Sequence, residues 1–297
     1  MNPKMLSVHY TAECAKRCAG CYLEPLRGCN EIDKSEWLKL PTVALSAGIE
    51  KIAIAVNDPG LKPVNVGYEC IFAADFINEC SKNKIKADIT TIADVANYLY
   101  MYDLNDSPSL FSKIDVFSIS VDHSKVPGLR ELSRVCKIAE GISKKGIGSL
   151  NANFLINRNG KIKFEWFREL LKYFNTVHII FEKPFPYSKD EYYTIIESMD
   201  KHGIFEDERF IVDPCVLFRM GLVNNCHSCS YMVDISPNGD VAGCVYSHCN
   251  YPIGNVNKME DLPDLLEQTE EMLVTNCDFL EFVTINENNE ERCSNSH

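Results

Sequence analysis

Short apolar runs alternate with amphipathic stretches over the first two thirds of the chain. The apolar runs have the length of buried strands, and each is followed by a stretch with helical periodicity. The expected strands are residues 6–10, 51–56, 86–92, 115–121, 149–156 and 176–181. The expected helices are residues 35–47, with Ser35 as N-cap, 68–81, 93–102, 128–144, 163–174 and 190–202. This alternation predicts a parallel sheet with helical crossovers, an α/β fold, but does not decide whether the sheet is open or partly closed.

Residues 206–297 follow a different pattern, and we expect them to form an extension of a domain comprising residues 1–205. Two β-patterned runs, 231–236 and 240–245, flank the sequence Pro-Asn-Gly-Asp at residues 237–240. This arrangement is typical of a hairpin turn. The extension is therefore expected to contain a β-hairpin.

Composition and charge narrow the class of protein. Of the 297 residues, 45% are hydrophobic and 24% are charged, which is typical of a globular protein with a sizeable core. The net charge of −12 argues against nucleic acid as a partner. No apolar run approaches the roughly 20 residues that span a bilayer, and no signal-peptide core is present at the N-terminus. We therefore expect a cytoplasmic protein without a membrane partner.

The 14 cysteines are unusual for such a protein. Cytoplasmic thiols stay reduced, so metal or redox chemistry explains these cysteines better than disulfides do. Cys70, Cys80 and Cys136 lie within apolar or helical patterns and are expected to be core residues. The other cysteines lie near the two ends of the chain.

Cys14, Cys18 and Cys21 form a C-x3-C-x2-C motif directly after the first expected strand. Parallel α/β folds place their chemistry at this end of their strands. Three thiolates are one short of a closed tetrahedral site, so they suit a [4Fe–4S] cluster with one open iron. The alternatives are a zinc site completed by Cys29 or His9 and a chance clustering.

A second group of cysteines lies in the extension. The expected hairpin brings Cys229 and Cys244 to neighbouring strand ends, and Cys226 forms a knuckle with Cys229. A site with four thiolates, which adds Cys215, would bind either zinc or a second iron–sulfur cluster.

The cysteine triplet and the sixfold β–α pattern together resemble the radical S-adenosylmethionine (radical SAM) enzymes. Over about residues 5–205 this resemblance implies a partial (β/α)6 TIM-like barrel. It implies that the open iron of the catalytic cluster binds S-adenosylmethionine, which is reductively cleaved to a 5′-deoxyadenosyl radical that abstracts a substrate hydrogen. It also implies flavodoxin or ferredoxin as the electron donor.

The resemblance also implies residues that bind S-adenosylmethionine. Val56-Asn57-Asp58-Pro59 takes the place of the family's Gly-Gly-Glu-Pro turn, so Asp58 is implied as a ligand of the amino group. An ordinary turn is the alternative interpretation of these residues. Tyr22 is implied near the adenine, although Gly20 replaces the aromatic residue that the family often has before its last cysteine. Further candidates at the ends of the fourth and fifth strands are Ser120, Asp122 and Asn153.

The pattern Cys229-x9-Gly239-x4-Cys244 resembles the SPASM or twitch extension of these enzymes, which binds auxiliary [4Fe–4S] clusters. The later cysteine run of a full SPASM module is absent, so one auxiliary cluster is implied. Its expected ligands are Cys226, Cys229 and Cys244, with Cys215 as the preferred fourth ligand and Cys249 or Cys277 as rivals. The expected substrate is a small molecule or, as the second choice, a peptide or protein. A non-enzymatic zinc protein is the rival from another class.

Overall fold

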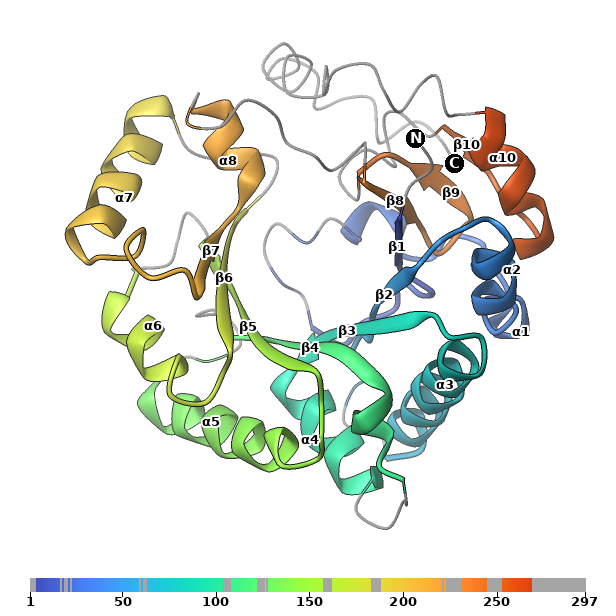
Figure 1. Cartoon of the computed structure of the whole chain (residues 1–297), viewed down its shortest axis with the longest axis horizontal. Helices are drawn as coiled ribbons and strands as arrows, with labels where there is room; N and C mark the ends of the chain where they lie inside the picture. Colours follow the sequence, from blue (N-terminus) through green and yellow to red (C-terminus); the bar gives the residue numbers. More distant parts are fainter. Residues whose placement is uncertain are drawn as a thin grey trace.

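The fold of the chain is an open, curved, mostly parallel β-sheet whose outer face is covered by helices (Figure 1). The computed structural model describes residues 4–16, 18, 21, 23–58, 60, 63–103, 108–121, 126, 128–156, 162–182, 188–220, 222, 231–244 and 253–268. The strand order in the sheet is β10-β9-β8-β1-β2-β3-β4-β5-β6-β7. This arrangement confirms the predicted partial TIM-like barrel, and it shows that the sheet is open.

The strands are β1 (Met5–Val8), β2 (Lys51–Ala55), β3 (Lys86–Ile92), β4 (Ile114–Ser120), β5 (Ser149–Ile156), β6 (Thr176–Phe181), β7 (Phe210–Val212), β8 (Met232–Ile235), β9 (Asp240–Ala242) and β10 (Gly254–Asn255). The helices are α1 (Lys34–Trp37), α2 (Leu40–Ser46), α3 (Pro63–Lys82), α4 (Ala93–Tyr102), α5 (Leu129–Ser143), α6 (Phe164–Leu170), α7 (Lys189–Lys201), α8 (Pro214–Arg219) and α10 (Leu262–Gln268). The 3-10 helices in the described part of the chain are η1 (Glu24–Leu26), η3 (Leu110–Lys113) and η4 (Met259–Asp261). No helix in the described part of the chain is long and apolar enough to cross a membrane.

Strands β1 to β7 pair in parallel in chain order, as the alternating pattern predicts. The expected hairpin is confirmed, because β8 pairs with β9 in an antiparallel arrangement. Three features of the sheet were not predicted. Strand β7 extends the sheet beyond β6, and β8 pairs in parallel with β1 in the register Met5 to Met232. Strand β10 pairs with β9 in an antiparallel arrangement.

The first helical region differs from the prediction. The expected single helix is divided into α1 and α2, because Pro41 has no backbone N–H to continue the hydrogen-bond ladder. The prediction of Ser35 as the N-cap is wrong. Asp33 is the N-cap, and its carboxylate accepts a hydrogen bond of 2.8 Å from the backbone N–H of Ser35.

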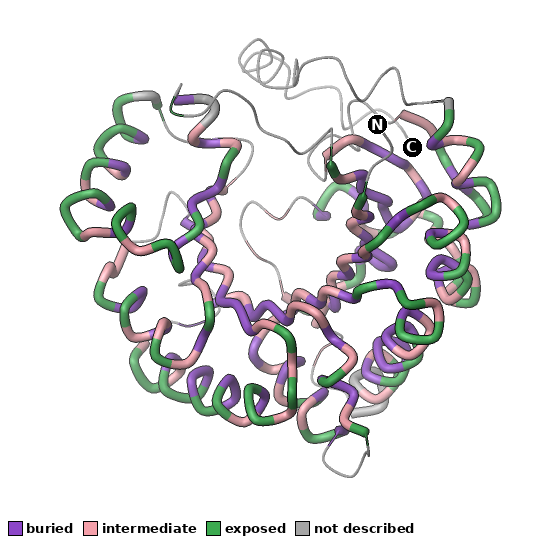
Figure 2. The backbone as a smooth tube through the Cα atoms, in the orientation of Figure 1, coloured by how far each residue is buried: buried purple, intermediate pink, exposed green. Residues whose placement is uncertain are grey.

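Packing against the outer helices establishes which face of each strand is the inner one. The ring of Phe154 on β5 lies 4.7 Å from Phe167 of α6, and Phe181 on β6 lies 5.5 Å from Tyr192 of α7. In Figure 2, buried residues lie along the strands and on the sides of the helices that face the strands. Because side chains alternate along a strand, the residues next to these phenylalanines face the concave side of the sheet.

The three cysteines in the middle of the chain are core residues, as predicted. Cys70, Cys80 and Cys136 have exposed fractions of 3%, 0% and 3%. Burial raises the pKa of Cys80 to about 12 and the pKa values of Cys70 and Cys136 to about 11. These thiols therefore stay protonated and are poorly suited to bind a metal.

Candidate active site

The C-x3-C-x2-C motif lies on one loop that follows β1 at its carboxyl end. Cys14, Cys18 and Cys21 are all half-buried, and the backbone N–H of Cys21 donates a hydrogen bond of 3.3 Å to the carbonyl of Cys18. In the regions that the structure describes, no three His, Cys, Asp or Glu side chains are grouped closely enough to hold a metal ion. The loop therefore carries the three thiols, and their joint binding of a cluster stays a prediction.

The turn after β2 is bonded directly to the cysteine loop. The side-chain amide of Asn57 donates hydrogen bonds to the carbonyls of Thr11 (2.8 Å) and Glu13 (3.4 Å). The backbone N–H of Ala15 donates to the carbonyl of Asp58 over 2.7 Å. Sequence reasoning placed Asp58 near the cysteines, and these contacts explain how the two loops are held side by side.

The Asp58 carboxylate faces the same region. Its Oδ1 accepts a hydrogen bond of 2.9 Å from the backbone N–H of Gly60, and its Oδ2 lies 3.9 Å from the ammonium of Lys16. Gly60 has φ +83°, and a Cβ atom there would lie 3.3 Å from the Cβ of Ala15. A glycine therefore suits this turn both by its backbone conformation and by its closeness to the cysteine loop.

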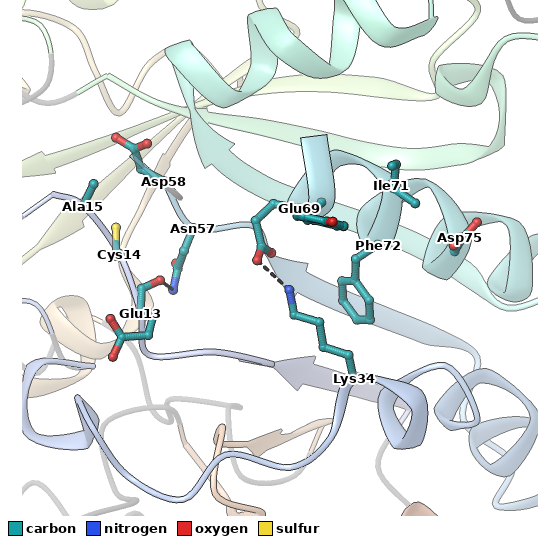
Figure 3. Close-up of a pocket in the computed structure, with 11 residues that line it drawn as sticks. Glu13, Cys14, Ala15, Lys34, Asn57, Asp58, Glu69, Ile71, Phe72 and Asp75 are labelled. Atoms are coloured by element: carbon teal, nitrogen blue, oxygen red, sulfur yellow. Dashed lines mark hydrogen bonds and ion pairs between the residues drawn. The ribbon is translucent and has the colours of Figure 1, made fainter. Parts of the chain in front are cut away.

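A cavity of about 780 Å³ opens beside Cys14 (Figure 3). Its size is within the range of small-molecule sites. One wall carries Cys14, Asn57 and Asp58, and the opposite wall carries the ion pair of Lys34 with Glu69. The lining residues are Glu13, Cys14, Ala15, Lys34, Asn57, Asp58, Tyr68, Glu69, Ile71, Phe72 and Asp75.

The wall opposite Cys14 is a bonded network. The Tyr10 hydroxyl donates a hydrogen bond of 2.5 Å to Glu69, which also accepts a bond of 2.5 Å from Lys34. Burial and the neighbouring Glu69 carboxylate raise the pKa of Tyr10 well above its ordinary value. The Lys34 ammonium also lies 5.5 Å from the centre of the Tyr10 ring and 5.4 Å from that of Phe72. Lys34 and Glu69 thus form an ion pair in this wall of the cavity.

Three polar residues form a row across the concave face. The strand register places Ser120 of β4 beside Asn153 of β5, and Asn153 beside His178 of β6. The Oδ1 atom of Asn153 is buried and has no hydrogen-bond partner among the described residues, so it is a candidate acceptor for a ligand. Neither Ser120 nor Asn153 lines the cavity beside Cys14, so the structure does not gather all the predicted cofactor residues around one described cavity.

Sequence reasoning missed His178. Its position on the same face as Asn153, and its distance of 3.5 Å from the amide nitrogen of Asn151, follow from strand alternation and register. Burial lowers the pKa of His178, so its imidazole is neutral near pH 7. The alternating pattern of the sixth strand could have identified it as an inward-facing polar residue.

His9 and Cys29, the candidates for completing a zinc site, have other surroundings. His9 is buried, and its Nε2 lies 3.3 Å from Oδ1 of Asp234 on the neighbouring strand β8. Cys29 packs against a small apolar cluster that includes Ala12 and Leu26, and burial raises the pKa of its thiol. These contacts give both residues a structural role that needs no metal.

The structure describes two of the predicted ligands of an auxiliary cluster. Cys215 lies in α8, where its backbone N–H donates a hydrogen bond of 3.0 Å to Asp213, and Cys244 follows β9. Both are half-buried. The predicted site residues outside the described part of the chain are Tyr22, Asp122, Cys226 and Cys229, together with the rival ligands Cys249 and Cys277.

No protein-family model and no curated protein matches the sequence of this chain. Solved structures do match its fold. SuiB of Streptococcus suis, solved with its precursor peptide SuiA, has a TM-score of 0.65 and 17% identity over 89% of this chain and 64% of its own. This chain therefore spans slightly less than two thirds of the length of SuiB, which has also been solved with S-adenosylmethionine.

The protein anSMEcpe, solved with bound AdoMet, matches 98% of this chain and 86% of its own, with a TM-score of 0.51 and 14% identity. Its complex with AdoMet and the Cp18Cys peptide gives a TM-score of 0.52 and 14% identity over 91% of this chain and 81% of its own. At these identities the matches establish a shared fold. They confirm the resemblance to the radical SAM enzymes at the level of the fold.

Proposed function

We propose that this chain is a radical SAM enzyme that reductively cleaves S-adenosylmethionine and removes a hydrogen atom from a substrate at the mouth of the partial barrel. The observation that carries the proposal is the position of the C-x3-C-x2-C loop. It follows β1 in a fold shared with structures solved with S-adenosylmethionine, and it borders a cavity that also contains Asp58.

The side chains present suit a [4Fe–4S] cluster. Cys14, Cys18 and Cys21 are half-buried on one loop, and neither Cys14 nor Cys21 is part of a disulfide. Thiolates are the ligands that such clusters use, and three of them leave one iron available. When bound, the cluster supplies the electron for the cleavage of S-adenosylmethionine to a 5′-deoxyadenosyl radical.

The other residues bind and orient S-adenosylmethionine. Oδ1 of Asp58 accepts a hydrogen bond from Gly60, and Oδ2, which lies 3.9 Å from the Lys16 ammonium, would accept from the cofactor's ammonium group. On the concave face, Oδ1 of Asn153, which no described residue bonds, would accept from a ribose hydroxyl, and Ser120 lies beside it. Tyr22 and Asp122 complete the proposed set.

Anaerobic reconstitution tests the proposal. The catalytic triplet should retain about four irons per chain, and reduction with dithionite should release 5′-deoxyadenosine from S-adenosylmethionine. Cys18→Ala should abolish this cleavage, whereas Cys29→Ala on the same segment should retain it. Stoichiometric zinc without cofactor cleavage would instead support the non-enzymatic zinc protein.

An auxiliary [4Fe–4S] cluster in residues 206–297 belongs to the same proposal. It would be held by Cys226, Cys229 and Cys244, with Cys215 as the fourth ligand, and would assist oxidation or substrate binding. Reconstitution should then give about eight irons per chain, and Cys244→Ala should reduce this number to about four. An unchanged iron content in Cys244→Ala would exclude Cys244 as a ligand.

We propose a peptide as the substrate, ahead of a small molecule. The support is that SuiB and anSMEcpe have both been solved with bound peptides, SuiA and Cp18Cys. Peptides encoded next to the gene of this chain are the first substrates to test. Mass spectrometry should show a mass change in one of them that depends on both S-adenosylmethionine and Cys18.

A reduced flavodoxin or ferredoxin is the proposed electron donor. The chain should form 5′-deoxyadenosine when either protein replaces dithionite in the assay. If dithionite supports the cleavage and neither protein does, the proposed donor is wrong and the proposed reaction still stands.

A further inference from the structure

Arg27 binds the backbone of the cysteine loop. Its guanidinium donates hydrogen bonds from Nη1 to the carbonyl of Cys14 (2.8 Å) and from Nη2 to the carbonyl of Lys16 (2.9 Å). Its Nε lies 2.5 Å from Oε2 of Glu24. The Arg27 side chain is only 11% exposed, although Glu24 is 54% exposed. A charged group is thus placed against the backbone of the cysteine loop.

These contacts connect the two ends of the segment from Cys14 to Arg27. Arg27 lies in the turn after η1, and it reaches back to two carbonyls that precede Cys18 and Cys21 in the sequence. A guanidinium is a rigid planar fork, so it can hold two neighbouring carbonyls in one fixed orientation. Glu24 occupies the remaining Nε position and sets the plane of the fork.

Further hydrogen bonds hold the residues just before Cys14. Asn57 holds the carbonyls of Thr11 and Glu13, and Glu31 accepts bonds from the Thr11 hydroxyl (2.9 Å) and the Ala12 N–H (2.7 Å). These bonds fix the start of the loop. The contact from Arg27 is made to the backbone of Cys14 itself, and therefore to a proposed ligand.

We propose that Arg27 is a positioning residue for Cys14, and that its charge makes the catalytic cluster easier to reduce. The first part rests on the two carbonyl bonds, and the second rests on the proposed function. Hydrogen bonds and charge next to ligating residues tune both metal affinity and reduction potential. A permanent cation beside Cys14 favours the reduced cluster, because that form carries one more negative charge.

The positioning role predicts the hydrogen exchange of the cysteine loop in the apoprotein. In Arg27→Ala, the loop loses both carbonyl bonds, and the backbone N–H of Ala15, which is bonded to the carbonyl of Asp58, should exchange with deuterium about tenfold faster, as expected for one charged hydrogen bond lost. Arg27→Lys keeps the charge and can reach one carbonyl, so its rate should be intermediate. Arg209→Ala is the matched control, because it also removes an arginine paired with a nearby acid, Asp207, at an exposed position.

The role of the charge is tested in the reconstituted protein. An EPR redox titration should give a more negative midpoint potential for Arg27→Ala than for the wild type, with Arg27→Lys close to the wild type. Iron content should fall in Arg27→Ala and be largely restored in Arg27→Lys. Wild-type values of both potential and iron content in Arg27→Ala would overturn this role.

The two measurements separate this inference from the proposed function. Hydrogen exchange is measured without iron, so a wild-type rate in Arg27→Ala would overturn the positioning of Cys14 whether or not the chain binds a cluster. A faster rate would support it in both cases. If the wild type binds no iron, the proposed function and the effect on potential both fail, while hydrogen exchange still decides the positioning role.

Discussion

Replacing Asp58 with asparagine removes a charge from the cavity beside Cys14 and keeps the turn that carries it. The Oδ1 atom of an asparagine can still accept the 2.9 Å hydrogen bond from Gly60, and the backbone bond from Ala15 to residue 58 is unaffected. The carboxylate is only 14% exposed, so solvent screens it weakly. Asp58→Asn therefore tests the charge rather than the fold of the loop.

The expected loss follows from the type of bond removed. A hydrogen bond to a charged group contributes about 1.5–3 kcal/mol, which corresponds to roughly a 10- to 100-fold weaker affinity for S-adenosylmethionine. Lys16, whose ammonium lies 3.9 Å away, already neutralises part of the carboxylate charge. We therefore expect a loss near the lower end, about tenfold.

The assay is equilibrium binding of S-adenosylmethionine to anaerobically reconstituted protein, together with the KM for 5′-deoxyadenosine formation. Asp94→Asn is the control, because Asp94 also lies 3.9 Å from Lys16 but does not line the cavity and is 40% exposed. Its affinity should stay within about twofold of the wild type, as expected for a screened surface charge. Equal losses in Asp58→Asn and Asp94→Asn, or no loss in Asp58→Asn, would refute the reasoning.

Three further predictions concern the fold that holds the site. Asp103→Ala should lower the free energy of unfolding by about 3 kcal/mol in chemical denaturation, because it removes the fully buried carboxylate that lies 3.1 Å from the Lys145 ammonium and leaves that ammonium only the backbone carbonyl of residue 103. A loss below about 1 kcal/mol would contradict this. The wild type should lose stability as the pH falls below about 6.5, since the unfolded state binds a proton that buried His178 resists, and His178→Asn should flatten this dependence between pH 7.5 and 5.5. Gly239→Ala should lower the melting temperature more than Gly48→Ala. Both glycines have positive φ, but of the two only residue 239 would bring a Cβ to 2.1 Å from a backbone oxygen, that of Val256. Equal shifts in melting temperature would contradict this.

The strands of the sheet could be predicted from the sequence because each is a compact apolar run between turn signals. The predicted bounds of β3, β5 and β6 agree with the structure to the residue. Strand β7 was missed because it is only three residues long, from Phe210 to Val212, and so has no detectable periodicity. The parallel pairing of β8 with β1 was missed because the sequence contains no local signal for pairing between distant segments.

The candidate site was only partly predictable, for the same reason. Spacing identified Cys14 and its partners, and a turn motif identified Asp58. The residues that hold the loop, Arg27 and Asn57, act through bonds to backbone carbonyls, which leave no trace in spacing or composition. His178 was missed because its role depends on the register between strands rather than on its neighbours in the chain.

The pairing of β8 with β1 also has a consequence for how the protein is made. Strand β1 emerges first from the ribosome, but the edge that accepts β8 is covered only after Met232–Ile235 have been synthesised. Until then β1 presents unpaired backbone groups at a sheet edge, which is a template for association with other chains. A chain that stops before β8 should therefore aggregate even with every residue of the cysteine loop present. A newly made chain is thus protected from aggregation at this edge when β8 completes the sheet, rather than when the cysteine loop is complete.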